Sequence, residues 1–472
     1  MIIKQMYLPC LSQASYLIGD LSSGRAVVVD PRRDIEEYLE EAGSLGLSIG
    51  DVLLTHVHAD FLAGHLELRA RTGARIHMGS RAQVEFPIER HSSGSRIRLG
   101  EVELEILETP GHTPESICIA VHEPGRDPAV PHALLTGDTL FIGDVGRPDL
   151  MAALKLCPED MAAMLYDSLQ ERILKLPDSV LIYPGHGAGS ACGRKMSSET
   201  WSTLGEQRKT NYALQPMSRE AFVRELTETR PAPPTYFFLD STLNRKEHPT
   251  LEVTMENSLR PLTSEEVLRR VNQGAQLLDT RDADEFAREH VQGSFNIGLS
   301  GRFAHWAGTV LDLERPIVLL CTPGSEPETV MRLGRIGIDS VAGYVEGGIE
   351  TFKGRSDLLR SFPRVTAEQL DRDFERLTAE RQILDVRGQD EWDSMRIKDA
   401  ILVPLPELRA RLKDVPRDRP LLVHCLSGYR SAVASSILEA GGFKVSDLKG
   451  GIQAFSRQSR QHLEIGTGCS IE

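Results

Sequence analysis

The strongest constraint on the fold is an internal repeat in the second half of the chain. Three pairs of blocks recur in the same order: LLDTRDADEF (277–286) with ILDVRGQDEW (383–392), ERPIVLLCTPG (314–324) with DRPLLVHCLSG (418–428), and EGGIETF (346–352) with KGGIQAF (449–455). A period of about a hundred residues predicts two copies of one whole domain and not a solenoid. The join falls near SFPRVTAEQL (361–370), where a proline and a Thr N-cap open the second copy.

Composition limits the class of protein. At 472 residues the chain is long enough for roughly two to four domains. The net charge of −14, with acids and bases well mixed, argues against nucleic acid or an anionic membrane as a partner. The apolar stretches are strand-sized and the N-terminus has no signal-peptide pattern, so we expect a cytoplasmic protein. Seven widely spaced cysteines do not form a disulfide framework.

In residues 1–215, strand-like runs end directly in histidine or aspartate. Six such groups occur in four segments: His56, His58 and Asp60 in THVHADFLAGH (55–65), His112 in TPGHTPES, Asp138 in LLTGDTLF and His186 in IYPGHGAGS. A stiff strand end can hold imidazoles at fixed spacing, which metal ligation requires. A lone histidine is more often structural, but six groups on successive strand ends predict a metal site. The proline-rich stretch 230–252 is interpreted as a linker with some packed aromatics.

The order H-x-H-x-D, G-H-T, G-D and P-G-H resembles the metallo-β-lactamase superfamily. The resemblance covers the first 215–245 residues and implies an αββα sandwich with the metal at one edge. In the superfamily's glutathione thioesterases, the position of Phe61 is a histidine that helps to hold a second metal. The residues that remain, His56, His112 and Asp138, form a two-histidine, one-carboxylate set typical of non-haem Fe(II) oxygenases. This subset resembles the persulfide dioxygenases, which implies one Fe(II) per chain.

Supporting roles are expected for the neighbouring residues. His58, Asp60 and His186 are expected to orient the ligands without binding the metal themselves. Arg147, in GDVGRPDL (143–150), corresponds to an arginine that anchors the thiol substrate, and the alternative is a structural ion pair with Asp149. The family's tyrosine after the last motif histidine is replaced by small residues in GHGAGSACGR, which predicts a wider pocket.

The second copy of the repeat contains VHCLSGYRSAVASSIL (423–438), a strand, a cysteine loop and a helix. The amides of such a loop, the helix N-terminus and Arg430 favour a thiolate at Cys425, so we expect a nucleophile that carries sulfur as a persulfide. This region resembles the rhodanese (sulfurtransferase) family over residues 362–460, and the family's fold is an α/β domain with a parallel sheet. The resemblance implies that Ser427, Gly428, Tyr429 and Arg430 form the cradle for the sulfur substrate.

The first copy places Cys321 in register with Cys425 but changes its surroundings. Glu326 stands at the position of Arg430, Pro323 removes an amide donor and Glu328 adds negative charge. These changes raise a thiol pKa, so this copy is interpreted as a degenerate, structural module, with a weak second sulfur carrier as the alternative. Cys192 and Cys469 have too little context for a function, although Cys192 could relay sulfur or line the pocket.

Together these features predict an α/β multidomain chain: a metallo-β-lactamase αββα sandwich (1–245), a degenerate rhodanese-like domain (258–357) and a catalytic rhodanese domain (362–460). This architecture resembles bacterial persulfide dioxygenase–rhodanese fusions of sulfide detoxification. It implies oxidation of a small-molecule thiol persulfide, such as glutathione or coenzyme A persulfide, by O₂ to sulfite, and sulfur transfer that makes or uses thiosulfate. The alternatives are a two-metal thioester hydrolase of the glyoxalase II type and a sulfur carrier or sensor. A homo-oligomer is the base-rate expectation.

Overall fold

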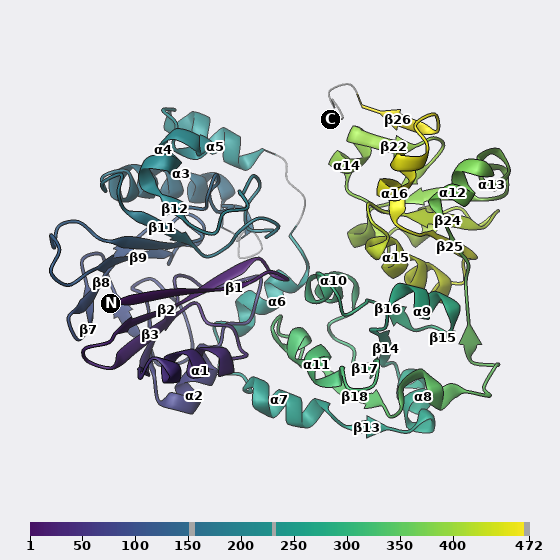
Figure 1. Ribbon diagram of the computed structural model, residues 1–472, viewed down its shortest axis with the longest axis horizontal. Coiled ribbons are helices and arrows are strands. Elements are labelled where there is room, and N and C mark those ends of the chain that lie inside the picture. Colours follow the sequence, from purple (N-terminus) through teal and green to yellow (C-terminus); the bar gives the residue numbers. More distant parts are fainter. Residues whose placement is uncertain (151–155, 229–232, 467–472) are drawn as a thin grey trace. The chain divides into compact units, whose positions relative to one another are not determined.

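The computed structural model describes residues 1–150, 156–228 and 233–466, so Cys469 lies outside the described residues. The chain divides into two compact units, Met1–Thr254 with Gly334–Gly337, and Met255–Leu333 with Ile338–Glu472. Figure 1 traces the elements of each unit. No helix among the described residues has the length and apolar character needed to cross a bilayer.

Two six-stranded sheets form the centre of the first unit. The strands of the first sheet, in order, are β1 (Ile2–Leu8), β2 (Gln13–Asp20), β3 (Arg25–Val29), β4 (Ser48–Leu53), β5 (Arg75–Gly79) and β6 (Glu89–His91). The strands of the second sheet are β12 (Ser202–Thr203), β11 (Leu181–Pro184), β10 (Ala133–Gly137), β9 (Ile117–His122), β8 (Val102–Glu108) and β7 (Arg96–Leu99). Alternate residues such as Val27 and Val29 on β3 and Leu104 and Ile106 on β8 are buried together between the sheets.

Helices cover the outer faces of both sheets. The first sheet contacts α1 (Glu36–Ser44) and α2 (His65–Thr72). The second sheet shares a hydrophobic cluster with α3 (Pro158–Ser168), α4 (Leu204–Thr210) and α5 (Arg219–Thr227). The result is a layered helix–sheet–sheet–helix arrangement, which confirms the predicted αββα sandwich.

The segment expected to be a linker contains a packed helix. Residues Tyr236–Leu243 form α6, with Tyr236 and Phe237 buried, and Leu251–Ser258 form α7. The interpretation of 230–252 as a linker was therefore wrong for residues 236–243, whereas the expectation of packed aromatics was correct, and residues 230–232 lie outside the described residues. Proline and polar residues at both ends of the stretch conceal a short apolar helix that buries two of its three aromatic residues.

The second unit contains two five-stranded parallel sheets of identical topology. The first runs in the order β13 (Pro261–Leu262), β18 (Val341–Val345), β17 (Ile317–Leu320), β14 (Gln276–Asp279) and β16 (Phe295–Asn296). The second runs in the order β20 (Arg364–Val365), β25 (Val445–Leu448), β24 (Leu421–His424), β21 (Gln382–Asp385) and β23 (Ile401–Leu402). This equivalence confirms the internal repeat.

Helices with matching positions accompany the two sheets. In the first copy they are α8 (Ser264–Asn272), α9 (Ala283–Arg288), α10 (Phe303–Val310) and α11 (Glu326–Gly334). In the second copy they are α12 (Ala367–Arg372), α13 (Phe374–Glu380), α14 (Gln389–Ser394), α15 (Tyr429–Ala440) and α16 (Gly451–Gln458). Thr366 caps α12 in a capping box, which confirms the predicted N-cap at the start of the second copy.

Candidate metal centre and sulfur-transfer loop

The predicted metal ligands meet at one edge of the sandwich. The loop after β4 supplies three of the six groups, and the loops after β8, β10 and β11 supply one each. Main-chain hydrogen bonds join the two sheets here, from Ile117 N–H to Thr55 O at 2.8 Å and from Ala14 N–H to Gly185 O at 2.8 Å. All six groups are buried: His56, His58, Asp60, His112, Asp138 and His186.

Three of the groups converge on one point. One ligand atom from each of His56, His112 and Asp138 lies within 4.8 Å of the others. Asp138 Oδ2 is 3.9 Å from His56 Nε2 and 3.5 Å from His112 Nε2, and it has no hydrogen-bond partner among the described residues. Because a buried carboxylate oxygen without a partner is costly, this geometry fits a metal ion between the three side chains.

The other ring nitrogen of each histidine is held by the protein. His112 Nδ1 lies 3.0 Å from the carbonyl oxygen of Arg147, and His56 Nδ1 lies 3.0 Å from the hydroxyl of Thr55. Since a carbonyl oxygen only accepts, His112 donates from Nδ1 and leaves Nε2 as the free lone pair for a metal.

Electrostatics favour the charge states that ligation requires. Burial lowers the pKa of His56 well below its usual value, and the neighbouring His58 lowers it further, so the ring is neutral at pH 7. Burial raises the pKa of Asp138, but the surrounding histidines, His186 first, outweigh this and hold it below its usual value. A neutral imidazole beside an ionised carboxylate is the state that binds a divalent metal.

His58 and His186 face carboxylates. His58 Nε2 lies 2.9 Å from Asp30 Oδ1, and Asp30 also accepts hydrogen bonds from the amide and hydroxyl of Thr55 at 2.8 Å each. His186 Nδ1 lies 2.8 Å from Asp138 Oδ1, and its Nε2 lies 2.8 Å from Asp60 Oδ2. Burial lowers the pKa of His186, but these two carboxylates raise it well above its usual value. His186 thus contacts the proposed ligand Asp138, whereas His58 contacts Asp30, and a role of either residue in orienting the ligands stays a prediction.

Phe61 is fully enclosed beside these rings. Its side chain is 1% exposed and its ring centroid lies 4.4 Å from that of His58. It supplies an apolar wall and no ligand atom.

Arg147 forms the ion pair that the sequence analysis considered as its alternative role. Its guanidinium makes two hydrogen bonds to the Asp149 carboxylate, at 3.0 and 2.6 Å, and a third contact to the carbonyl oxygen of Ala191 at 3.3 Å. The side chain is largely buried, and its main chain supports His112. Substrate binding by Arg147 stays a prediction.

The two cysteine loops of the second unit differ in one hydrogen bond. In the second copy, the amide of Gly428 donates to Cys425 Sγ at 3.1 Å, and Cys425 Sγ lies 3.7 Å from Ser431 Oγ. In the first copy, the amide of the equivalent Gly324 donates to the Glu326 carboxylate at 2.8 Å. The amide that stabilises sulfur in one loop is therefore occupied by a carboxylate in the other.

The four residues predicted to form the cradle around Cys425 differ from one another in exposure and in hydrogen-bond partners. Ser427 is exposed at the loop tip and Gly428 has a φ of 98°. The Arg430 guanidinium is paired at 2.7 Å with both carboxylate oxygens of Glu391. The hydroxyl of Tyr429 donates to the carbonyl oxygen of Gly298 in the first copy at 2.7 Å, so this residue links the two copies.

Comparison with known proteins identifies both kinds of domain. The family model of the metallo-beta-lactamase superfamily matches residues 8–186, and that of the rhodanese-like domain matches residues 263–355 and 366–458. The human mitochondrial persulfide dioxygenase ETHE1 is 33% identical over 232 residues, which cover 47% of this chain and 79% of the relative. The chain belongs to the metallo-β-lactamase superfamily and is a relative of the persulfide dioxygenases.

The chain is also similar to other proteins of the metallo-β-lactamase superfamily. A hydroxyacylglutathione hydrolase of Polaromonas is 36% identical over 175 residues, 36% of this chain and 61% of the relative. A crystal structure of a metallo-beta-lactamase from Staphylococcus aureus has a TM-score of 0.65 at 32% identity and covers 73% of this chain and 98% of its own. The fused architecture of a metallo-β-lactamase domain and two rhodanese-like domains is thus confirmed.

Sequence reasoning missed two residues of the metallo-β-lactamase domain. Asp30 directly follows β3, has a positive φ of 50° and hydrogen-bonds to His58 and Thr55. The strand-like run AVVVD (26–30) ends in this aspartate, so the strand-end pattern was a signal that could have found it. Asn244, after α6, donates from its amide to the carbonyl oxygens of His58 and Phe61 and accepts from the amide of Ala63.

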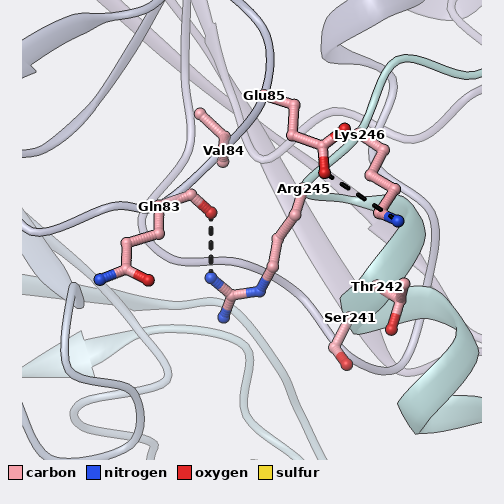
Figure 2. Close-up of a pocket in the computed structure, with 7 residues that line it drawn as sticks. All are labelled: Gln83, Val84, Glu85, Ser241, Thr242, Arg245 and Lys246. Atoms are coloured by element: carbon pink, nitrogen blue, oxygen red, sulfur yellow. Dashed lines mark hydrogen bonds and ion pairs between the residues drawn. The ribbon is translucent and has the colours of Figure 1, made fainter.

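A separate pocket lies between residues 83–85 and the end of α6 with the residues that follow it. Its cavity is about 330 Å³ and is lined by Gln83, Val84, Glu85, Ser241, Thr242, Arg245 and Lys246. Figure 2 shows that Arg245 points to the carbonyl oxygen of Gln83 and that Lys246 faces Glu85. None of the lining residues belongs to the metal cluster, so the pocket is not the candidate active site.

Proposed function

We propose that the chain is a persulfide dioxygenase coupled to a thiosulfate sulfurtransferase. Its substrates would be a small-molecule thiol persulfide, of glutathione or coenzyme A, O₂ and one water molecule, which supplies the third oxygen of sulfite and a proton for the thiol; its products would be sulfite and the thiol. The observation that carries the proposal is the ligand set itself. His56, His112 and Asp138 converge, while Phe61 fills the adjacent position with an apolar ring.

In this proposal His56, His112 and Asp138 hold one Fe(II) per chain. The iron supplies the capacity to bind and activate O₂ beside a sulfur anion, because two imidazoles and one carboxylate leave coordination positions open. The protein's part is positioning: Arg147 O fixes the ring of His112, Asp30 fixes His58, and His186 fixes Asp138. The buried surroundings limit the access of bulk solvent to the reacting sulfur.

Arg147 is the proposed anchor for the charged end of the thiol. One face of its guanidinium is held by Asp149, which fixes the orientation of the group. A fixed guanidinium can recognise a carboxylate or phosphate of the substrate with little loss of entropy.

Cys425 is the proposed sulfur carrier. Its thiolate would attack sulfane sulfur, and the bond from that sulfur to its donor breaks as the S–S bond to Cys425 forms. The amide of Gly428 stabilises negative charge on sulfur, and Ser427, Tyr429 and Arg430 complete the cradle. Transfer of the sulfane sulfur to sulfite gives thiosulfate, and the reverse reaction uses thiosulfate. We place this activity in the cytoplasm, in a homo-oligomer, without nucleic acid.

An oxygen electrode tests the proposal. Anaerobically purified, iron-loaded protein should consume O₂ with glutathione persulfide or coenzyme A persulfide and should release sulfite. No uptake with either persulfide would refute the dioxygenase. Similarity to the hydroxyacylglutathione hydrolase supports one competing candidate, a two-metal thioesterase. Hydrolysis of a glutathione thioester without O₂ uptake would establish that candidate instead.

A further inference from the structure

An ion cluster of three residues, Asp284, Arg364 and Lys449, joins the two copies of the repeat. Asp284, on α9 of the first copy, lies between the two cations, which belong to the second copy. Its Oδ1 is 2.8 Å from Arg364 Nη1, and its Oδ2 is 2.8 Å from Lys449 Nζ. Lys449 and Arg364 hold the pKa of Asp284 below its usual value, so the carboxylate is ionised at neutral pH. One carboxylate of the first copy thus pairs with two side chains of the second.

The Arg364 side of the ion cluster lies against the cysteine loop. Arg364 Nε donates to Asp447 Oδ2 at 2.8 Å, and Asp447 is fully buried. Arg364 Nη2 would lie 3.7 Å from a Cβ added to Gly428, the residue whose amide donates to Cys425 Sγ. A guanidinium that is held by two carboxylates has a fixed orientation, so it supports the loop at Gly428.

The Lys449 side of the ion cluster borders the same loop. Lys449 directly precedes Gly450, whose nitrogen would lie 3.1 Å from a Cβ added to Gly428. One turn further, the amide of Ile452 donates to the carbonyl oxygen of Cys425 at 2.8 Å. Both cations of the cluster therefore adjoin main chain that packs on the cysteine loop.

The first copy provides an internal comparison, because its sheet has the same topology. Its first strand, β13, pairs with β18 in the register in which β20 pairs with β25. The three positions equivalent to the charged residues around the cysteine loop differ in chemistry: Pro261 for Arg364, Tyr344 for Asp447 and Glu346 for Lys449. The two cations and the buried carboxylate thus occur in the copy whose loop directs an amide to sulfur. This favours a role in that loop over simple adhesion between the copies.

We propose that Asp284 of the first copy is a positioning residue for the sulfur-transfer loop of the second. It fixes Arg364 and Lys449, and these two side chains fix the main chain from which the amide of Gly428 points at Cys425 Sγ. A correctly aimed amide stabilises negative charge on sulfur. The proposal rests on the proposed role of Cys425 as the sulfur carrier. It gives the first copy a function that does not require a reactive cysteine of its own.

Alkylation of Cys425 by iodoacetamide in the full-length chain tests this positioning without turnover. Asp284 is 41% exposed, so Asp284→Asn should fold. The substitution removes a negative charge near the loop, so direct electrostatics alone would favour the thiolate and speed alkylation at pH 7. Loss of positioning has the opposite sign, because a misaligned amide of Gly428 stabilises the thiolate less. We expect alkylation, followed by peptide mass spectrometry, to slow roughly two- to fivefold, the size expected for exposed ion pairs. An unchanged or faster rate would overturn the proposal.

Three variants serve as controls for the alkylation rate. Asp284→Glu keeps the carboxylate and should retain the rate of the unaltered chain. Asp390→Asn should also leave the rate unchanged, because Asp390 holds the equivalent exposed position on α14 and forms no ion pair among the described residues. Ser436→Ala removes a different contact between the copies, the hydrogen bond of 2.9 Å from the amide of Asn296. It should lower the unfolding temperature without slowing alkylation. Equal slowing in Ser436→Ala and Asp284→Asn would mean general loosening and would refute positioning by the ion cluster.

Thiosulfate:thiol sulfur transfer separates this proposal from the proposed function. In Asp284→Asn, kcat should fall by the same roughly two- to fivefold while KM for thiosulfate changes little. A lower KM with unchanged kcat would mean that Asp284 masks the two cations from the anion, which would exclude positioning. If the unaltered chain transferred no sulfur, the proposed sulfurtransferase would be refuted, whereas the alkylation rates would still decide the role of Asp284.

Discussion

The side-chain amide of Asn244 donates a hydrogen bond of 2.9 Å to the carbonyl oxygen of His58, across 186 residues of sequence. The same side chain donates to Phe61 O at 2.8 Å and accepts from Ala63 N–H at 2.9 Å, and it is 1% exposed. Asn244→Ala leaves three buried main-chain groups without partners. Each such group costs about 1–3 kcal/mol, so we expect a clear loss of stability in the first unit.

Thermal unfolding monitored together with metal content tests the role of Asn244. The metal-binding loop should loosen, so the variant should retain less metal at equal protein concentration. Asn272→Ala changes an exposed asparagine and serves as the matched control. Equal unfolding midpoints and metal contents for the two variants would show that the loop does not depend on Asn244.

Two substitutions should separate the two activities. His112→Ala removes a proposed ligand of the iron and should abolish O₂ uptake, while thiosulfate:thiol sulfur transfer continues. Cys425→Ser removes the proposed sulfur carrier and should abolish sulfur transfer, while O₂ uptake with a supplied persulfide continues. Both activities are measured on the same preparations. If each substitution abolished both activities, independent sites would be excluded.

Cys321 should be almost unreactive at neutral pH. Burial raises the pKa of its thiol to about 11, and the Glu326 carboxylate adds to the effect. Because the thiolate exists only as the pH approaches this pKa, its fraction at pH 8 is on the order of 0.1%. Alkylation of Cys321 by iodoacetamide, followed by peptide mass spectrometry, should therefore rise about tenfold per pH unit between pH 8 and 10.

A charge variant identifies the cause of this low reactivity. Glu326→Gln removes the carboxylate that accepts from the amide of Gly324 and should speed alkylation of Cys321 at a given pH. Glu328→Gln is the matched control, because Glu328 pairs with Arg332 and not with the loop amide. Equal rates in the two variants would exclude the Glu326 carboxylate as a cause and leave burial and the Asp279 carboxylate.

The features that could be predicted from the sequence are those that depend on a local sequence pattern. Strand-end residues such as His56 and Asp138 could be placed because a strand and the loop after it are adjacent in sequence. The two copies of the repeated domain could be recognised because the three pairs of matching sequence blocks occur in the same order. Cys192 could not be assigned, since its approach to Asp60 depends on how two separate loops meet at the sheet edge. Asn244 was missed for the same reason, and the helix before it was concealed by flanking prolines.

Gly451, the first residue of α16, packs closely against the main chain of the loop that holds Cys425. A Cβ at this position would lie 2.4 Å from Cys425 O and 2.5 Å from Leu426 O, and the residue has a φ of 59°. Gly451→Ala must therefore displace the loop that holds the nucleophile, at a cost of about 1–3 kcal/mol from overpacking. We expect sulfur transfer to fall sharply and O₂ uptake to remain. Gly442→Ala is the control, because its φ is 80° but no atom lies within 4 Å of the added Cβ. Equal sulfur-transfer rates in the two variants would show that left-handed backbone strain, and not contact with the Cys425 loop, determines the effect.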